Sequence, residues 1–367
     1  MRAGPGSAAA AGPSIKPGPP PSPRVDVRQE VVQKIIAAMK EGNTPWQRPW
    51  SAVSMKAING VTDNAYRGIN RLLLSLAGEA YSDPRWLTFK QAAANGWMVK
   101  KGSKGQMIVK VVDLDRDPAS PGQGGQADRG DGQRAGDHRS EGKSGAQGEQ
   151  SEGSPPKRIA LKRYFVFNAE QIEGIPPLPE PEGQPEFDPV DKAEAIFKAL
   201  KEQTGLLVVH GGNKACYIPA TDEIRLPKKS AFASSADLWS VSLHEAAHCT
   251  LSEKRLDRRD ALGQRWGDEA YAMEELRAEL CSAITSAETG VYASPEMAAT
   301  HIAKHASYLA SWIKVLEKDP MALFSAARDA DKMATYLVDL GREHTAMATH
   351  KEWVAEYDAT QEAGQRR

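Results

Sequence analysis

The spacing of apolar residues predicts two neighbouring strands in the first half of the chain. The runs MIVKVV at 107–112 and RYFVFN at 163–168 are short and rich in β-branched and aromatic residues, as strands are. Between them, the segment 113–156 has no large apolar residue after Leu114, so it cannot form a core. We therefore expect one sheet interrupted by a disordered insertion. A domain boundary at the insertion is the alternative, and it leaves each strand with an unpaired edge.

The second half of the chain shows mainly the periodicity of helices. An amphipathic pattern begins near Val190 and stops at Gly205, and longer helical patterns follow after a strand-like region. The patterns predict strands at 206–210, 215–218 and 223–226 and helices at 190–205, 236–253, 268–289, 295–317 and 320–342. This order predicts a mainly helical domain with a small sheet.

Low-complexity segments divide the chain into two domains. Residues 1–24 consist mostly of Pro, Gly, Ala and Ser, which predicts a disordered leader. Six prolines occur in 174–189, and such a segment is extended and semi-rigid. We expect an α+β protein with a leader at 1–24, a small α/β domain at 25–176 that contains the insertion at 113–156, a Pro-rich linker at 177–189, a mainly helical domain with a small sheet at 190–345 and a tail at 346–367.

The overall composition allows two globular domains but hides a charge asymmetry. The chain has 367 residues, of which 40% are hydrophobic, enough to give each domain its own core. Its net charge is only −1, yet residues 24–112 hold fourteen Lys or Arg against six Asp or Glu, a surplus of eight. A basic half beside an acidic half indicates a polyanionic partner. The alternative is a solvated basic surface.

Several classes of protein are excluded by what the sequence lacks. No stretch approaches the roughly 18 to 20 continuous apolar residues that span a bilayer, and the N-terminus lacks the hydrophobic region of a signal peptide. We therefore expect a cytoplasmic protein with no membrane partner. The cysteines Cys216, Cys249 and Cys281 are odd in number and have no CxxC spacing, so they indicate reduced, buried thiols and not a disulfide framework or a thiolate zinc site.

An HExxH motif, HEAAH at 244–248, lies inside a predicted helix with Ser234 as its N-cap. Residues four apart lie on the same face of a helix, so His244 and His248 can bind one zinc ion. Glu245 lies beside that ion, where it can take a proton from the attacking water and return it to the leaving amine. The sequence thus predicts one Zn2+ per chain and a metallopeptidase. The alternative is a pair of core histidines.

A catalytic zinc site needs a third protein ligand and leaves the fourth position to water. The predicted helix at 268–289 offers three carboxylates, Glu274, Glu275 and Glu279, beside an apolar stripe. Glu275 and Glu279 are four residues apart, so one can bind the metal while the other orients a histidine. We assign Glu275 as the ligand and Glu279 as the residue that orients a histidine. Each of the three carboxylates can instead be a solvated surface charge.

The cleft for a peptide is less well defined by the sequence. The extended run YIPATDEIRLP at 217–227 precedes the zinc helix and fits an edge strand that can pair with an extended peptide. It can equally be a purely structural strand. The residue that stabilises an oxyanion is not identified, and Tyr217, Tyr271, His301 and His305 are candidates.

Aromatic and basic residues interleave in the predicted N-terminal domain. This composition is typical of single-strand binding, in which aromatic faces stack on bases at about 1–3 kcal/mol each and cations follow the phosphates. The alternative is that the tryptophans belong to the core, which we expect for Trp86. The candidate DNA-binding residues are Trp46, Arg48, Trp50, Tyr66, Arg67, Arg71, Arg85, Lys90, Lys100, Lys101 and Lys104.

Nine motifs together carry a resemblance to a known family. They are GNTPWQRPW, TDNAYRGINRLLL, SDPRWLTFKQA, VKKGSKG, RYFVFNAEQIEG, YIPATDEIRLP, HEAAH, YAMEELRAEL and HASYLASWIKVLEKD. In these, over about residues 27–112, 158–178 and 190–345, the chain resembles the ArdC-type antirestriction proteins of conjugative plasmids and is similar to the N-terminal part of TraC-type plasmid primases. The resemblance implies a domain that binds single-stranded DNA, a zincin-type metallopeptidase domain, and protection of incoming DNA from restriction endonucleases. It implies no particular peptide substrate.

Three functions are compatible with these features. The first is a protein in which DNA binding localises a zinc peptidase that acts on a host or restriction protein. The second is a non-catalytic protein that binds single-stranded DNA and keeps a structural or vestigial metal site. The third, a primase-associated accessory protein, is less favoured because the chain ends soon after the zincin-like region. Glu245 favours the first function, because a structural site needs no carboxylate beside the metal.

Overall fold

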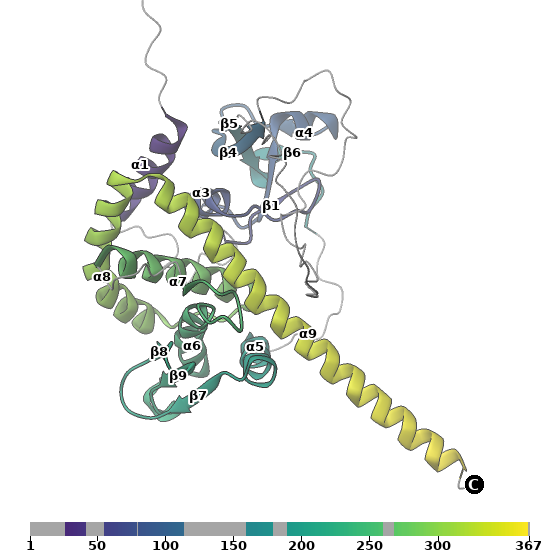
Figure 1. The fold of residues 1–367 in the computed structure, drawn as a ribbon. Coiled ribbons are helices and arrows are strands. Elements are labelled where there is room, and N and C mark those ends of the chain that lie inside the picture. Colours follow the sequence, from purple (N-terminus) through teal and green to yellow (C-terminus); the bar gives the residue numbers. More distant parts are fainter. Residues whose placement is uncertain are drawn as a thin grey trace, which may run out of the picture.

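The structure is a computed structural model, shown in Figure 1. It describes residues 26–41, 55–78, 80–113, 159–178, 189–259 and 268–365. The expected leader at 1–24, nearly all of the insertion at 113–156 and most of the linker at 177–189 lie outside these residues. None of the helices within the described ranges combines the length and the apolarity that a membrane span requires.

The first half of the chain forms a small unit of helices and strands. Its elements are α1 (Val27–Lys40), β1 (Ile58–Asn59), α3 (Ile69–Gly78), β2 (Arg85–Thr88), α4 (Phe89–Ala94), β3 (Met98–Val99), β4 (Gln106–Asp113), β5 (Ile159–Asn168) and β6 (Ile172–Glu173). One sheet has the strand order β1-β2-β5-β4, and β3 pairs with β6 in a second sheet. Only the β1–β2 pair is parallel among the strand pairs described in this half.

The strands β4 and β5 are adjacent and antiparallel, as the sequence predicts. Their register places Met107 opposite Phe165, so the alternative of a domain boundary at the insertion is wrong. β4 is an outer strand of its sheet. The side-chain amide of Asn70 in α3 donates to the Val109 carbonyl and accepts from the Val109 N–H, both at 2.8 Å. This amide satisfies backbone groups that an outer strand otherwise exposes.

Trp86 lies in the core of the larger sheet, as predicted. Its side chain is 2% exposed and packs with Leu74 and Val166. The ring of Tyr81 meets it edge-on, with ring centroids 5.6 Å apart. Such enclosure makes Trp86 a packing residue, and it has no ring face left for stacking on a base.

The second half forms the mainly helical domain. Its elements are α5 (Pro189–Thr204), β7 (Leu207–His210), β8 (Cys216–Ile218), β9 (Glu223–Leu226), α6 (Ser235–Cys249), α7 (Asp268–Thr289), α8 (Pro295–Lys318) and α9 (Met321–Gln365). The small sheet has the order β7-β9-β8, in which β9 runs parallel to β7 and antiparallel to β8. All helices and strands predicted for this half are confirmed, and the α+β fold class is confirmed with them.

α9 is longer than the helix predicted at 320–342. It is one helix of 45 residues that crosses the molecule diagonally and projects beyond it (Figure 1), so the predicted tail at 346–367 is helical up to residue 365. Residues 346–351 are exposed. An exposed helical segment buries no apolar face, so its sequence shows no apolar periodicity from which a helix could be predicted. α9 packs against α5 and α7. At Gly341 a Cβ atom would lie 2.7 Å from the Ile196 Cγ1 atom, so a larger residue would push α9 away from α5.

The two halves share one hydrophobic core. Val31 and Ile35 of α1 belong to the same buried cluster as Trp312 and Leu316 of α8, and α1 packs directly against α8. Leu72 of α3 and Met107 of β4 also belong to this cluster, and two smaller clusters surround Trp86 and Leu87 of β2. The expectation of a separate core for each half is therefore wrong for α1, α3 and β4, whose buried residues share a cluster with the second half.

Candidate metal centre

The helix α6 carries the HExxH motif and is fixed at its start. The Ser234 hydroxyl accepts from the Asp237 N–H at 3.0 Å, so Ser234 is the predicted N-cap. The Asp237 carboxylate accepts from the Ser294 N–H at 2.7 Å, which ties α6 to the start of α8. Further along α6, His244 and Glu245 are 9% and 7% exposed. The motif therefore lies in a nearly enclosed part of a helix that is anchored by its cap.

The neighbouring helix α7 places a third donor between the two histidines. His244, His248 and Glu275 each offer one ligand atom, and these three atoms lie within 4.8 Å of one another. The Nε2 atoms of His244 and His248 lie 3.7 and 3.6 Å from the two carboxylate oxygens of Glu275. Two imidazole nitrogens and a carboxylate that converge in this way fit a divalent metal ion.

Two further carboxylates face the other ring nitrogens. The Nδ1 atom of His244 lies 3.4 Å from Glu279 Oε1, and the Nδ1 atom of His248 lies 3.4 Å from Glu274 Oε1. Each imidazole thus directs Nε2 toward Glu275 and Nδ1 toward its own carboxylate. Histidines that bind metals are commonly oriented by a carboxylate in this way. The sequence pointed to Glu279 for this role and missed Glu274.

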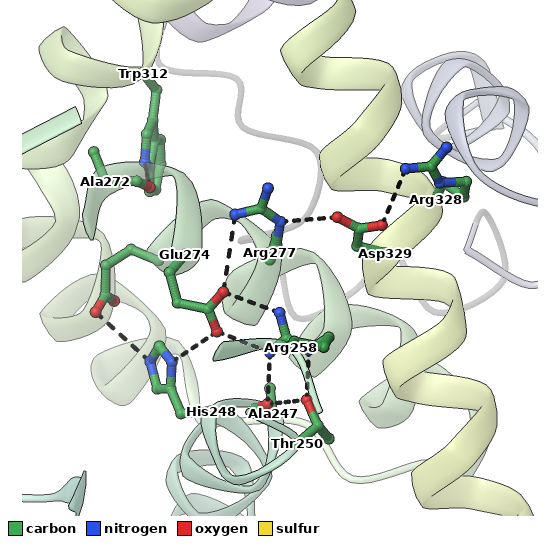
Figure 2. Close-up of polar contacts among 11 residues, drawn as sticks. Ala247, His248, Thr250, Arg258, Ala272, Glu274, Arg277, Trp312, Arg328 and Asp329 are labelled. Atoms are coloured by element: carbon green, nitrogen blue, oxygen red, sulfur yellow. Dashed lines mark hydrogen bonds and ion pairs between the residues drawn. The ribbon is translucent and has the colours of Figure 1, made fainter. Parts of the chain in front are cut away.

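Glu274 is held by a network of arginines that Figure 2 shows. Arg258 donates to its two carboxylate oxygens at 3.0 and 2.9 Å. Arg277 lies 3.9 Å from the same carboxylate and donates to Asp329 of α9 at 3.0 Å. Burial raises the pKa of Glu274, but the contacts with His248 and Arg258 outweigh burial and lower it. Glu274 is therefore held ionised beside His248.

The side chains around the histidines make the centre strongly acidic. Burial lowers the pKa of His244, but the nearby carboxylates of Glu275, Glu279 and Glu245 outweigh burial and raise that pKa to about 9. Burial raises the pKa of Glu275, but its contacts with His244 and His248 lower that pKa to about 2. Such a cluster attracts a cation. A metal ion that binds here must displace the proton of His244.

The centre opens into a cleft of about 760 Å³. This volume lies within the range of about 300–1,000 Å³ that is typical of ligand pockets. Glu245 lines the cleft together with both histidines. The rest of the wall is mainly apolar and aromatic, and includes Cys216, Tyr217, Phe232, Val241, Leu251, Tyr271, Met297 and Tyr308. The cleft can therefore admit an extended chain beside the metal donors.

The run at 217–227 is divided into two strands. β8 is an outer strand that lines the cleft, whereas β9 is central because it pairs with both β7 and β8. A turn with Asp222 at φ 51° separates them. The prediction of one edge strand is therefore wrong for β9, and within this sheet β8 is the strand that borders the cleft. Cys216 of β8 is only half-buried, while Cys249 and Cys281 are buried as expected.

The candidate DNA-binding residues differ widely in exposure. Trp46, Arg48 and Trp50 lie outside the described residues. Tyr66 is half-buried, and its hydroxyl accepts from the Asn59 side chain at 3.2 Å. The exposed members are Arg67, Lys90, Lys100, Lys101 and Lys104. These five cations face solvent, where a phosphate group can reach them.

Arg71 and Arg85 do not fit the expected role in DNA binding. Arg71 is 5% exposed, and its guanidinium lies 3.2 Å from Asp331 of α9 and donates to the Met55 carbonyl at 3.2 Å. Arg85 is 9% exposed and lies 2.7 Å from Asp83. A buried and paired guanidinium cannot reach a phosphate without leaving another charge unpaired. Both arginines therefore stabilise the fold, and Arg71 joins the first half to α9.

Exposed aromatic rings of the first half lie elsewhere than the sequence suggested. Phe89 is 61% exposed, Phe165 is 56% exposed and Tyr164 is 39% exposed. Phe89 begins α4 beside Lys90, and the other two rings lie on β5. The run RYFVFN is apolar or aromatic at successive positions, so the sequence did not reveal which of its rings face solvent.

Both halves match models of known domain families. Residues 25–167 match the N-terminal domain of anti-restriction factor ArdC, and residues 191–329 match a zincin-like metallopeptidase. The second match contains the HExxH motif of α6 and the three carboxylates of α7.

Three curated relatives align with most of the chain. It is 36% identical over 327 residues to DNA primase TraC of Escherichia coli, covering 86% of this chain and 20% of that protein. A second E. coli protein of that name is 36% identical over 320 residues and is covered over 27% of its length. The chain therefore spans about a quarter or less of these primases. It is 33% identical over 325 residues to the y4eC protein of Sinorhizobium fredii, covering 86% of this chain and 93% of that protein.

Two solved structures of one protein have a fold similar to that of this chain. The crystal structure of metal-free antirestriction protein ArdC from plasmid R388 is 28% identical, with a TM-score of 0.63 over 87% of this chain and 98% of that chain. The Mn(II)-bound structure of that protein is 28% identical, with a TM-score of 0.63 over 86% of this chain and 98% of that chain.

Proposed function

This chain belongs to the family of ArdC-type antirestriction proteins, and we propose that it binds single-stranded DNA and cleaves peptide bonds at a zinc centre. DNA binding places the peptidase on DNA that enters a cell, and a host or restriction protein in the cytoplasm is the substrate. The proposal is carried by one observation, the convergence of His244, His248 and Glu275 in a cleft beside Glu245.

The donor set supports zinc as the metal. His244, His248 and Glu275 supply two imidazoles and one carboxylate, a combination found in catalytic zinc sites. The similar ArdC protein of plasmid R388 has a Mn(II)-bound structure, and sites of this type bind zinc more tightly than manganese. We therefore propose one zinc ion per chain. When bound, the ion supplies a Lewis acid that polarises a carbonyl group and acidifies a water molecule.

Glu245 is the proposed general base and general acid. It follows His244 directly in α6, is 7% exposed and lines the cleft. Glu279 and Glu274 face the Nδ1 atoms of the two histidines, so Glu245 is not needed to orient either ring. Its carboxylate is therefore the one suited to accept a proton from the attacking water and to return that proton to the leaving nitrogen.

The first half supplies the proposed DNA-binding surface. Phe89 and Phe165 offer exposed rings for stacking on bases, whereas Tyr164, the neighbour of Phe165 in β5, points to the opposite face of the sheet. Arg67, Lys90, Lys100, Lys101 and Lys104 are exposed cations. The proposal also includes Trp46, Arg48 and Trp50, which lie outside the described residues. Stacking rings and distributed cations favour binding without strong sequence preference.

A single comparison tests the peptidase. The zinc-loaded chain and its Glu245→Gln variant are incubated with a peptide library prepared from a bacterial proteome, and new termini are identified by mass spectrometry. We expect cleavage by the parent, and loss of cleavage in Glu245→Gln at unchanged zinc content. The control is Glu253→Gln, which changes an exposed carboxylate beyond the end of α6 and should cleave like the parent. If the parent gives no Glu245-dependent cleavage, the peptidase proposal is wrong.

A second candidate function is DNA binding without catalysis. The exposed rings Phe89 and Phe165 favour it, because coverage of single-stranded DNA can by itself block restriction enzymes. In that case Glu245→Gln protects DNA from restriction as well as the parent does. The primase-associated alternative rests on the TraC proteins, of which the chain spans only 20% and 27%.

A further inference from the structure

A row of aromatic rings leads from the core to the metal centre. Trp312 of α8 is 0% exposed, and its indole N–H donates to the Ala272 carbonyl of α7 at 2.6 Å (Figure 2). Tyr308 stacks on Trp312 with ring centroids 6.2 Å apart and planes inclined at 21°. Tyr271 meets Tyr308 with centroids 5.8 Å apart. The buried tryptophan therefore holds the ring of Tyr308 beside α7, where it contacts the ring of Tyr271.

Tyr271 is the member of this row that reaches the reaction site. It lies one helical turn before Glu275 on α7, and both Tyr271 and Tyr308 line the cleft. Its hydroxyl is within hydrogen-bonding reach of the Glu275 carboxylate and of the Tyr308 hydroxyl. The ring remains 39% exposed. The Tyr271 hydroxyl is held beside a proposed metal ligand and still faces the cleft, so it can donate a hydrogen bond to a substrate atom.

The other tyrosine that the sequence suggested for this role is committed to the fold. The Tyr217 hydroxyl donates to Asp222 at 2.9 Å and accepts from Arg255 at 3.4 Å. Arg255 in turn pairs with Asp222 and donates to the Thr204 hydroxyl at 2.8 Å. Tyr217 thus serves the turn between β8 and β9, although part of its side chain lines the cleft.

We propose that Tyr271 is a catalytic residue that donates a hydrogen bond to the oxygen of the scissile carbonyl group. The proposal rests on the proposed peptidase function. When water adds to the carbonyl carbon, a C–O bond forms, the water proton passes to Glu245, and the carbonyl π electrons move to the oxygen. Tyr271 stabilises that oxyanion. The C=O bond then re-forms, the C–N bond breaks, and Glu245 returns the proton to the leaving nitrogen.

Tyr308 acts through Tyr271 as a positioning residue. Its ring is stacked on the buried Trp312, and its hydroxyl lies within hydrogen-bonding reach of the Tyr271 hydroxyl. This contact limits the directions in which Tyr271 can present its proton. Tyr308→Phe should therefore lower turnover less than Tyr271→Phe does.

The first test separates catalysis from metal binding in Tyr271→Phe. Turnover of the peptide library should fall by about 100- to 1,000-fold, as when one donor to an oxyanion is lost, while zinc affinity in competition with a chromophoric chelator stays close to that of the parent. The matched control is Tyr292→Phe, whose hydroxyl donates to the Ala287 carbonyl at 3.5 Å. A loss of zinc affinity of about 10- to 100-fold, typical of a residue that orients a metal ligand, would overturn the proposal.

The second test uses no turnover. The chain is loaded with cobalt(II), and inorganic phosphate, whose tetrahedral oxygens resemble the oxyanion, is titrated while the visible spectrum is recorded. Tyr271→Phe should bind phosphate about tenfold more weakly, a loss that matches one hydrogen bond to a charged group, and Tyr292→Phe should bind as the parent does. Equal phosphate affinity in Tyr271→Phe and the parent overturns the proposal.

The two proposals fail in different ways. A parent chain without Glu245-dependent cleavage overturns the peptidase function and the role of Tyr271 together. A parent that cleaves peptides, with Tyr271→Phe equally fast, overturns only the role of Tyr271.

Discussion

The two halves of the molecule present their candidate functional residues in opposite ways. In the second half, His244, His248 and Glu275 come from two neighbouring helices, and two further carboxylates hold the histidines. In the first half, the candidate rings and cations lie on the surface of several elements. When the donors of a metal centre depend on one another for their orientation, removal of one residue is expected to abolish metal binding or catalysis. A dispersed surface is expected to lose affinity in small steps.

The largest expected effect is the loss of metal from the second half. Changing both His244 and His248 to Ala removes two of three donors, so zinc measured by mass spectrometry should fall from about one per chain to near zero. Binding of single-stranded DNA by the same variant should remain as in the parent. Retained zinc would show that the centre lies elsewhere, and lost DNA binding would show that the halves do not work separately.

A graded effect is expected within α7. Glu274→Gln should weaken zinc binding by about 10- to 100-fold, because it removes the carboxylate that faces a ligating histidine. Glu275→Gln should weaken zinc binding further, because it removes a donor atom. Competition with a chromophoric chelator measures both. The reverse order would mean that the wrong face of α7 has been assigned to the metal.

A smaller loss is expected for each ring of the first half. Phe89→Ala and Phe165→Ala should each weaken binding to an unstructured thymine oligonucleotide by about 1–3 kcal/mol, the value of one stacked base. Fluorescence anisotropy measures this affinity, and circular dichroism confirms the fold. Met98→Ala is the control, because Met98 is 65% exposed but has no ring. Unchanged binding in both phenylalanine variants contradicts the stacking surface, as does a preference for duplex DNA.

The metal-free chain is also expected to show a pH-dependent stability. The pKa of His244 is raised from 6.5 to about 9 in the folded chain, so the folded state binds a proton that the unfolded state releases. The resulting stabilisation is full below about pH 6.5 and is lost as the pH rises through about 9. The melting temperature of the metal-free chain should therefore fall over this window, and His244→Ala should remove the fall. A melting temperature that rises across this window would contradict the acidic cluster.

Much of the fold and of the centre could be predicted from local patterns. The strand pattern at 107–112 and 163–168 predicted the pairing of β4 with β5, because two apolar strands need partners. The spacing of His244 and His248 predicted a shared face, because a helix repeats its faces every three to four residues. By the same reasoning, the spacing of Glu275 and Glu279 placed both carboxylates on one face of α7, where Glu275 lies near both rings and Glu279 lies near His244.

The remainder depends on contacts between segments that are far apart in the sequence. Glu274 faces His248 while Arg258, from the segment after α6, binds its carboxylate, and no local pattern shows this approach. Arg71 was expected to meet DNA, but α9 brings Asp331 against it from 260 positions further along the chain. The exposure of Phe165 likewise depends on which helices cover β5. Burial of a charge or exposure of a ring is a tertiary property, so composition alone could not reveal it.

X-ray absorption at the zinc edge of the purified, zinc-loaded chain measures directly whether His244, His248 and Glu275 bind the metal. We expect nitrogen and oxygen ligands at about 2.0–2.2 Å from the zinc ion, with the multiple scattering of two imidazole rings. His248→Ala should remove one ring from that signal. Cys216 lines the same cleft, and a sulfur scatterer at about 2.3 Å, or a shell without imidazole, would contradict a centre formed by His244, His248 and Glu275.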